Sequence, residues 1–288
     1  MTTISTKLST DNGKLTFVKR NPLLSIYILM FIMAWSVMIP QALYSQGITS
    51  TPVPEILEIF TGWAPGIAAL IVFTVIAGRS GIREVFGRFL IWRIGFMWYL
   101  VGMFLLAGII LGGIGLHVLF GGAMPAIPVA GEPIWEIALT FLVLILMLSV
   151  FNTEEIVWRG IALPRLQARY GALAAAILIA IPEVALHLPL FWVTENPFYK
   201  NVGVPWFLAF SVAAIVIYIY VFNMTKGSLI IVTIMHASQN TWSNLLSDNS
   251  AGPFHFTVIL TWAIALALIV ITRGQLGQQI SEPYRPTG

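Results

Sequence analysis

Eight apolar segments, each of about 20 residues or more, dominate the sequence and restrict the folds open to it. They run approximately over residues 22–44, 55–77, 95–120, 133–153, 172–194, 205–223, 228–247 and 254–272. A helix needs about 20 mainly apolar residues to cross the hydrocarbon core of a bilayer. Only 9% of the 288 residues are charged, far below the roughly 25% of a soluble domain. We therefore expect an all-α, polytopic membrane protein with about eight transmembrane helices.

The linkers between these segments are too short to form an independent soluble domain. We divide the chain into an N-terminal tail over 1–21, a helical membrane domain over 22–272 and a C-terminal tail over 273–288. The first apolar segment is too long for the core of a signal peptide, so we expect it to be retained as a helix.

Basic residues divide unevenly between the two ends of these helices. If eight helices alternate in direction, 14 Lys and Arg residues fall on the side of the chain ends, and only Lys200 falls on the other. Cytoplasmic loops carry an excess of Lys and Arg. We therefore expect both termini to be cytoplasmic, and we attribute the net charge of +3 to topology rather than to nucleic-acid binding. The absence of cysteine excludes disulfides and thiolate metal sites.

A small set of ionisable residues interrupts the apolar segments. Such residues are costly inside a membrane, usually face the interior of the bundle and are candidates for a functional site. The candidates, with one amide as a polar companion, are Glu154, Glu155, Arg159, Glu183, His187, His236 and Asn240. A chemical role is less favoured for residues near the predicted span ends, where charge is tolerated; these are Glu58, His117, Glu136 and His255.

Helix geometry separates the two adjacent glutamates, Glu154 and Glu155. Glu155 and Arg159 are four residues apart, so they can pair on one helical face. Adjacent positions on a helix differ by about 100°, so Glu154 must point elsewhere. We expect Glu155 and Arg159 to support one another and Glu154 to be free for another role. Ordinary interfacial charges at a cytoplasmic helix end are the alternative.

Two more pairs of polar residues have the same spacing of four. Glu183 and His187 share a face near the middle of a span, and we expect Pro189 to distort the helix just beyond them. His236 and Asn240 share a face on a later helix. A carboxylate with a histidine can deprotonate water, directly or through a metal, and imidazole and amide groups can stabilise an oxyanion. The set fits hydrolysis, but proton-coupled transport uses similar residues, so residue types alone leave both open.

The order of these motifs resembles that of the CPBP family of intramembrane proteases. This family includes the type 2 CAAX prenyl endopeptidases and bacterial proteins labelled abortive-infection or bacteriocin-processing. Three motifs carry the likeness, which covers about residues 75–245: E-E-x-x-x-R from Glu154 to Arg159, H-L-P-L-F from His187, and H-x-x-x-N from His236 to Asn240.

The resemblance implies an intramembrane endopeptidase acting on a membrane-associated peptide or protein, with prenylated CAAX-type proteins as the best-known substrates. It implies that Glu154 and His187 activate the attacking water, while His236 and Asn240 bind the oxyanion. The implied setting is a multi-pass protein of the bacterial plasma membrane, with the lipid bilayer and the substrate as partners and no nucleic acid. Because Glu154 ends its predicted span on the cytoplasmic side, we expect the catalytic cavity to open to the cytoplasm and cleavage to occur near that face.

The sequence does not decide whether the site holds a metal cofactor. Glu154, His187 and His236 would suit zinc chemically, because carboxylate oxygen and histidine nitrogen both bind it. The compact H-E-x-x-H spacing of zinc proteases is missing from the sequence.

One position departs from the family pattern. The family usually has an aromatic residue four before the histidine of the second motif, and this chain has Glu183. A carboxylate there could raise the pKa of the imidazole, add a metal ligand, orient the ring or disable the site. A catalytically altered scaffold or immunity protein on the same fold is therefore the alternative to the protease. A proton-coupled transporter is disfavoured, because we find no repeat or paired interrupted helices.

Overall fold

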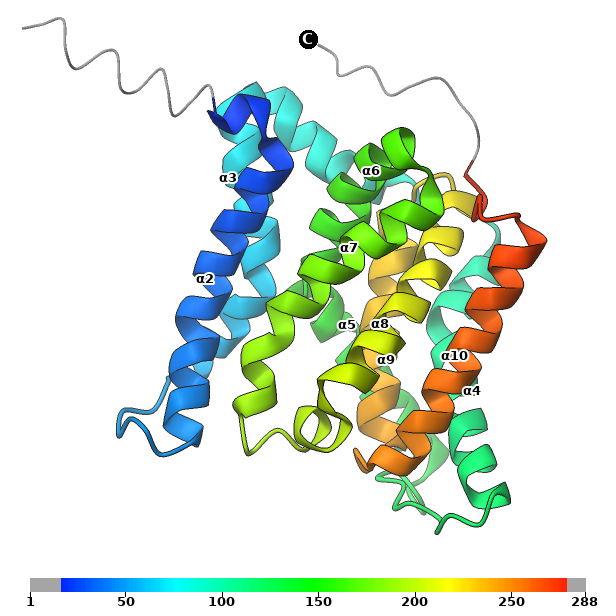
Figure 1. Ribbon diagram of the computed structural model, residues 1–288. Coiled ribbons are helices and arrows are strands. Elements are labelled where there is room, and N and C mark those ends of the chain that lie inside the picture. Colours follow the sequence, from blue (N-terminus) through cyan, green and yellow to red (C-terminus); the bar gives the residue numbers. More distant parts are fainter. Residues whose placement is uncertain (1–16, 279–288) are drawn as a thin grey trace, which may run out of the picture.

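The structure is a computed structural model, and it describes residues 17–278. Most of the two predicted tails, residues 1–16 and 279–288, lies outside this range. All regular secondary structure in the described chain is helical, and the described chain contains no strand (Figure 1). The predicted all-α membrane fold is confirmed, whereas the cytoplasmic location of the termini stays a prediction.

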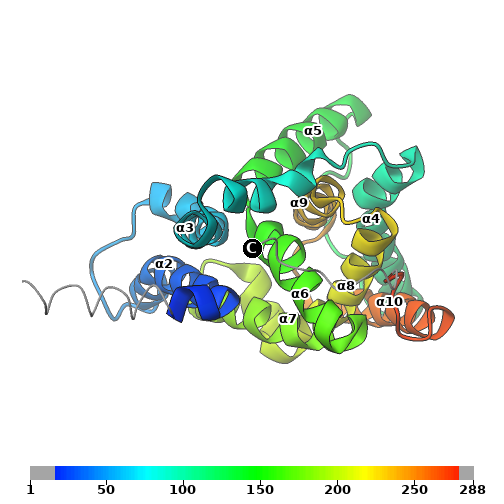
Figure 2. The same ribbon diagram turned by 90° about the horizontal axis from the view of Figure 1, so that it is seen from above.

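A long helix occupies each of the eight predicted segments. These helices are α2 (Pro22–Ser45), α3 (Glu55–Gly87), α4 (Phe96–Leu119), α5 (Ile134–Phe151), α7 (Ala172–His187), α8 (Pro197–Met224), α9 (Leu229–Leu246) and α10 (Ala251–Ile271). Seven of them are long and apolar enough to cross a membrane, and α9 is the exception. This helix carries His236 and Asn240, and it packs between α4, α5 and α8 (Figure 2). Its polar side chains are therefore placed inside the bundle.

Four short elements lie between the long helices of the described chain. They are the 3₁₀ turn η1 (Arg88–Leu90), the π-helix η2 (Ile156–Ala162), the helix α6 (Leu163–Tyr170) and the 3₁₀ turn η3 (Leu188–Trp192). As predicted, the α-helix that contains His187 ends there, with Pro189 in the turn that follows. Proline cannot donate to the helical ladder, and its ring clashes with the preceding turn.

The loops lie on two opposite faces of the bundle. We call the face formed by residues 46–54, 120–133, 193–196 and 247–250 the distal face; it lies at the foot of the bundle in Figure 1. We call the opposite face, which holds both described chain ends and the loops over 91–95 and 225–228, the basic face. Hydrogen bonds hold two distal loops against neighbouring elements: Gln46 donates to the Trp192 carbonyl at the end of η3, and Asn201 donates to the Asn249 carbonyl.

Candidate active site

Thr153 anchors the end of α5 to α3. The Thr153 backbone N–H and hydroxyl both donate to the Gly62 carbonyl, at 2.9 and 2.8 Å, while the hydroxyl oxygen accepts from the Gly66 N–H at 2.9 Å. In an uninterrupted α-helix those two glycine groups would pair with each other. Thr153 is thus inserted into the ladder of α3. Glycine is needed at both positions, because a Cβ at Gly62 would collide with the Phe151 carbonyl and one at Gly66 with Thr153.

The chain then continues inside the bundle rather than leaving the membrane. The π-helix η2 is wholly buried, and the side chains that open it are buried too: Glu154 is 7% exposed, Glu155 1% and Arg159 1%. The interpretation of these residues as interfacial charges at a helix end is therefore wrong. The physical reason is the Thr153 anchor, which holds the chain against α3 at the depth where α5 ends.

Glu154 is held by two donors from its own segment. The Trp158 indole N–H donates to Glu154 Oε2 at 3.1 Å, and the Asn152 amide donates to Glu154 Oε1 at 3.3 Å. Asn152 Oδ1 also accepts the Glu154 backbone N–H at 3.0 Å, so Asn152 caps the new helix. This arrangement fixes the carboxylate, and it leaves Oε1 facing His187, whose Nε2 lies 3.8 Å away.

The His187 ring is oriented by the main chain. Its Nδ1 lies 2.8 Å from the Glu183 carbonyl oxygen. A carbonyl can only accept, so Nδ1 carries the proton, and in the neutral ring Nε2 holds a lone pair. The Glu154 carboxylate and this lone pair face each other as two acceptors. Both can accept from one small donor placed between them.

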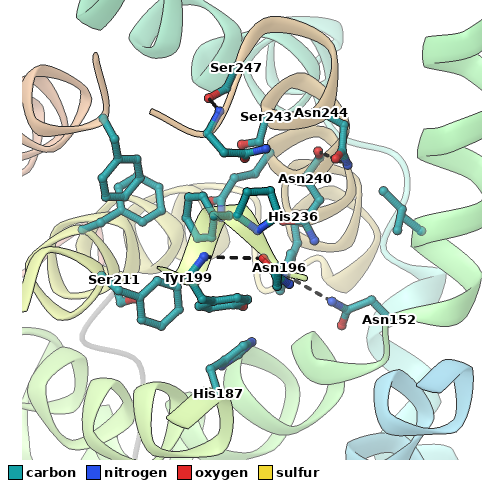
Figure 3. Close-up of a pocket in the computed structure, with 18 of the residues that line it drawn as sticks. Asn152, His187, Asn196, Tyr199, Ser211, His236, Asn240, Ser243, Asn244 and Ser247 are labelled. Atoms are coloured by element: carbon teal, nitrogen blue, oxygen red, sulfur yellow. Dashed lines mark hydrogen bonds between the residues drawn. The ribbon is translucent and has the colours of Figure 1, made fainter. Parts of the chain in front are cut away.

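His236 is held by two partners, one on each ring nitrogen. Its Nδ1 lies 2.8 Å from Glu155 Oε1, and its Nε2 lies 3.3 Å from the Asn152 amide nitrogen. Glu155 thereby aims Nε2 into the same space as Glu154. Figure 3 shows His236 and Asn240 on one helix, with Asn152 and His187 approaching from other segments. The sequence analysis did not identify Asn152 as a site residue. It could have been found from its position, because it carries an amide two residues before Glu154 at a predicted helix end.

Glu183 pairs with Arg159 instead of with His187. The Arg159 guanidinium lies 3.0 Å from Glu155 and 3.2 Å from Glu183, and it stands 4.5 Å from the centre of the Tyr218 ring. The predicted Glu155–Arg159 pair is therefore confirmed. The Glu183 main-chain carbonyl, which any residue could supply, orients His187. The Glu183 carboxylate, one of whose predicted roles was to orient that ring, instead contacts Arg159.

All seven predicted residues line one cavity of about 950 Å³. Tyr199 lines it too, with its ring centre 6.2 Å from that of His187. Sequence reasoning missed Tyr199 because α8 begins eight residues before the predicted segment, at Pro197.

The cavity opens toward the distal face. Residues of all four distal loops and the adjoining helix ends line it, among them Val53, Pro125, Glu195 and Asn249. Within the described chain, no residue of the loops over 91–95 or 225–228 lines it. The two predictions of cytoplasmic basic loops and a cytoplasmic opening are therefore incompatible. They conflict because the sequence analysis placed Glu154 at the cytoplasmic end of its span, whereas the segment that follows Glu154 is a buried helix.

The donor geometry does not fit the three zinc ligands considered above. Among residues 17–278, no three His, Asp or Glu side chains are grouped so that they could hold a metal. Both nitrogens of His236 are already engaged, by Glu155 and by Asn152. Since a catalytic zinc needs three protein ligands, we derive no step through a metal.

Comparisons with known proteins agree with the motifs. Residues 135–242, which contain all seven predicted residues, match the family described as type II CAAX prenyl endopeptidase Rce1-like. The chain is also 27% identical over 219 residues to the CAAX prenyl protease 2 of Methanococcus maripaludis, covering 72% of this chain and 79% of that protein. With the three motifs gathered around one cavity, these similarities support the resemblance to the CPBP family of intramembrane proteases.

Proposed function

We propose that Glu154 and His187 activate a water molecule that hydrolyses a peptide bond inside the membrane. The observation that carries this proposal is the separation of 3.8 Å between Glu154 Oε1 and His187 Nε2. A water there can donate one hydrogen to each acceptor, which points an oxygen lone pair into the cavity. Burial of Glu154 strengthens its interaction with a developing positive charge.

The reaction follows from this placement. The water oxygen attacks the carbonyl carbon while Glu154 takes a proton, which forms a tetrahedral oxyanion. The donors proposed for that oxyanion are the Asn240 amide and His236. His236 donates through Nε2–H when its ring is protonated, because a protonated Nε2 no longer accepts from the Asn152 amide. Collapse of the intermediate breaks the C–N bond, and the proton held by Glu154 passes to the leaving amine.

The position of Glu183 supports an enzyme over an inactive scaffold. Its carboxylate is paired with Arg159, so it neither fills the gap between Glu154 and His187 nor adds a charge there. We propose a membrane-associated peptide or protein as the substrate and the bacterial plasma membrane as the location. A prenylated CAAX-type peptide is a candidate because the Methanococcus relative bears the name CAAX prenyl protease 2.

Reconstituted protein tests this proposal. Wild type, Glu154→Gln and His187→Ala would be placed in liposomes with a set of lipid-anchored fluorogenic peptides, including a farnesylated C-a-a-X peptide. We expect each substitution to lower cleavage by at least about 10²-fold, the usual contribution of a general base. Glu136→Gln is the matched control, because Glu136 is a half-buried glutamate that does not line the cavity. Cleavage at the wild-type rate in either active-site variant would contradict the assignment.

A further inference from the structure

The mouth of the cavity is acidic. Four carboxylates line it at or next to the distal face: Glu55, Glu58, Glu195 and Asp248. All four residues are exposed, and within the described chain none forms an ion pair with Lys or Arg within 4 Å. Among the described residues, Arg159 is the one Lys or Arg that lines the cavity, and it is buried; His187 and His236 line the cavity as well. The mouth therefore presents a net negative charge, with Lys200 close enough for its charge to act on Glu195 but not within ion-pair distance.

Hydrogen bonds keep two of these carboxylates ionised. The Ser45 hydroxyl donates to Glu195 at 2.5 Å, and this bond lowers the pKa of Glu195. Partial burial opposes ionisation of Asp248, but hydrogen bonds from Ser250 outweigh it and lower the pKa of Asp248 as well. Both groups lie in distal loops and carry a full charge at neutral pH.

The acidic mouth is part of a wider separation of charge across the bundle. Ten of the twelve described Lys and Arg residues lie toward the basic face, and only Lys200 lies at the distal end of a helix. Two more acidic residues, Glu132 and Glu136, stand on the distal side outside the cavity. Because Lys and Arg mark the cytoplasmic side, this distribution places the mouth on the opposite side of the membrane.

A further carboxylate, Glu155, lines the cavity at its floor, where one of its oxygens pairs with Arg159 and His236. Glu155 is 1% exposed and lines the cavity, and its Oε2 has no hydrogen-bond partner within the described chain. A buried carboxylate oxygen without a partner is costly. It is thus a second feature, separate from the mouth, that favours a donor or cation entering from the mouth.

We propose that the cavity receives a cationic peptide segment from the side of the membrane opposite the basic face, with the mouth carboxylates holding its Lys or Arg side chains. This inference rests on the proposed function, because it identifies the substrate of the same site. The cationic segment docks at the distal face, and the peptide bond next to it reaches Glu154. The substrate is therefore presented outside the cytoplasm.

Cysteine labelling tests the side of the membrane. The chain has no cysteine, so a single substitution gives a unique label. Thr49→Cys marks an exposed position on the distal face, and Ala168→Cys marks an exposed position near the basic face. In intact bacterial cells, a membrane-impermeant maleimide should label Thr49→Cys, and Ala168→Cys should react only after the membrane is opened. The reverse pattern, or equal labelling of both in intact cells, would overturn the proposed side.

Binding of a charged probe tests the mouth separately from catalysis. A palmitoylated peptide with three lysines, and its counterpart with three glutamates, would be titrated into zwitterionic nanodiscs holding the Glu154→Gln protein. A variant that combines Glu55→Gln, Glu58→Gln, Glu195→Gln and Asp248→Asn neutralises the mouth. It should bind the lysine probe about tenfold more weakly than the parent protein, since exposed ion pairs contribute about twofold each to affinity. Near 1 M salt, where the Debye length is about 3 Å, the difference should vanish.

The double variant Glu132→Gln/Glu136→Gln removes charge from the same side without touching the cavity lining, and it should bind the lysine probe within about twofold of the parent. Equal binding of both probes, no effect of the mouth substitutions, or an equal loss in the double variant would overturn the inference. Cleavage of the same probes by wild-type protein gives the other readout. If wild-type protein cleaves the lysine and glutamate probes equally well, the preference for a cationic peptide is wrong but the protease function is supported. If it binds the lysine probe selectively but cleaves neither probe, the protease function is wrong.

Discussion

Arg159 and Glu183, which lie on different helices, form an ion pair of 3.2 Å whose side chains are 2% and 15% exposed. The same guanidinium pairs with Glu155 at 3.0 Å, and Glu155 in turn holds His236 at 2.8 Å. One arginine thus balances two carboxylates, one buried and one half-buried, beside the proposed catalytic pair Glu154 and His187. Glu183, which stands where the family usually has an aromatic residue, is therefore part of this ion-pair network.

Replacing Glu183 should affect stability more than catalysis. Glu183→Gln removes one carboxylate but leaves the main-chain carbonyl that orients His187 and the pairing of Arg159 with Glu155. We expect the free energy of unfolding to fall by about 1–3 kcal/mol, the cost of an impaired buried hydrogen-bonding group. Cleavage per folded molecule should stay within about threefold of wild type. Thermal unfolding followed by tryptophan fluorescence, alongside the liposome assay, measures both. A large loss of rate at full stability would show that the carboxylate acts in catalysis.

Replacing Arg159 should be more damaging, because it leaves both carboxylates without their cation. Arg159→Met is expected to destabilise the protein by about 3–5 kcal/mol. Adding Glu183→Met to it removes one of the stranded charges, so the double variant should recover part of that loss. A double-mutant cycle on unfolding free energies measures the coupling between the two side chains. Strict additivity would mean that the 3.2 Å pair contributes nothing.

The long helices and the polar residues that line the cavity could be predicted from the sequence, because both rest on short-range rules. Segment length sets the long helices, and the spacing of four sets the Glu155–Arg159 pair. The course of the chain after Phe151 depends instead on Thr153 meeting Gly62, 91 residues away, and no local pattern reports such a contact. The buried η2 segment and the distal opening of the cavity were missed for this reason.

The Thr153 anchor gives a third prediction. Thr153→Val keeps the shape of the side chain but removes the hydroxyl that bonds Gly62 and Gly66. The Gly66 N–H then loses its acceptor, so we expect a destabilisation of about 1–3 kcal/mol and a fall in cleavage as Glu154 shifts. Thr261→Val is the matched control, because that buried hydroxyl bonds only within its own helix, to the Thr257 carbonyl. If the two variants behave alike in both assays, the anchor does not position Glu154.

Cleavage should also resist chelation. The described side chains provide no group of three metal ligands, so prolonged dialysis against a chelator should leave the rate within about twofold of the untreated protein. Metal analysis of the dialysed sample supplies the control for complete removal. A loss of cleavage that added zinc restores would show instead that the ligands rearrange around a metal, since a catalytic zinc needs three of them.

Asn152 gives the last prediction, as the residue that joins the two halves of the site. Its amide nitrogen lies 3.3 Å from both Glu154 Oε1 and His236 Nε2. Asn152→Ala loses this donor, and we expect cleavage to fall by about tenfold, since a single hydrogen bond to a charged group contributes about 1.5–3 kcal/mol. Asn152→Asp, nearly the same in shape, puts a second carboxylate beside Glu154 and should be more damaging than the alanine variant at neutral pH. Protonation of that aspartate removes the like charge, so the aspartate variant should regain activity relative to wild type as the pH falls. Rate profiles of the three proteins from pH 5 to 8 measure this difference, and parallel profiles would contradict a positioning role for the Asn152 amide.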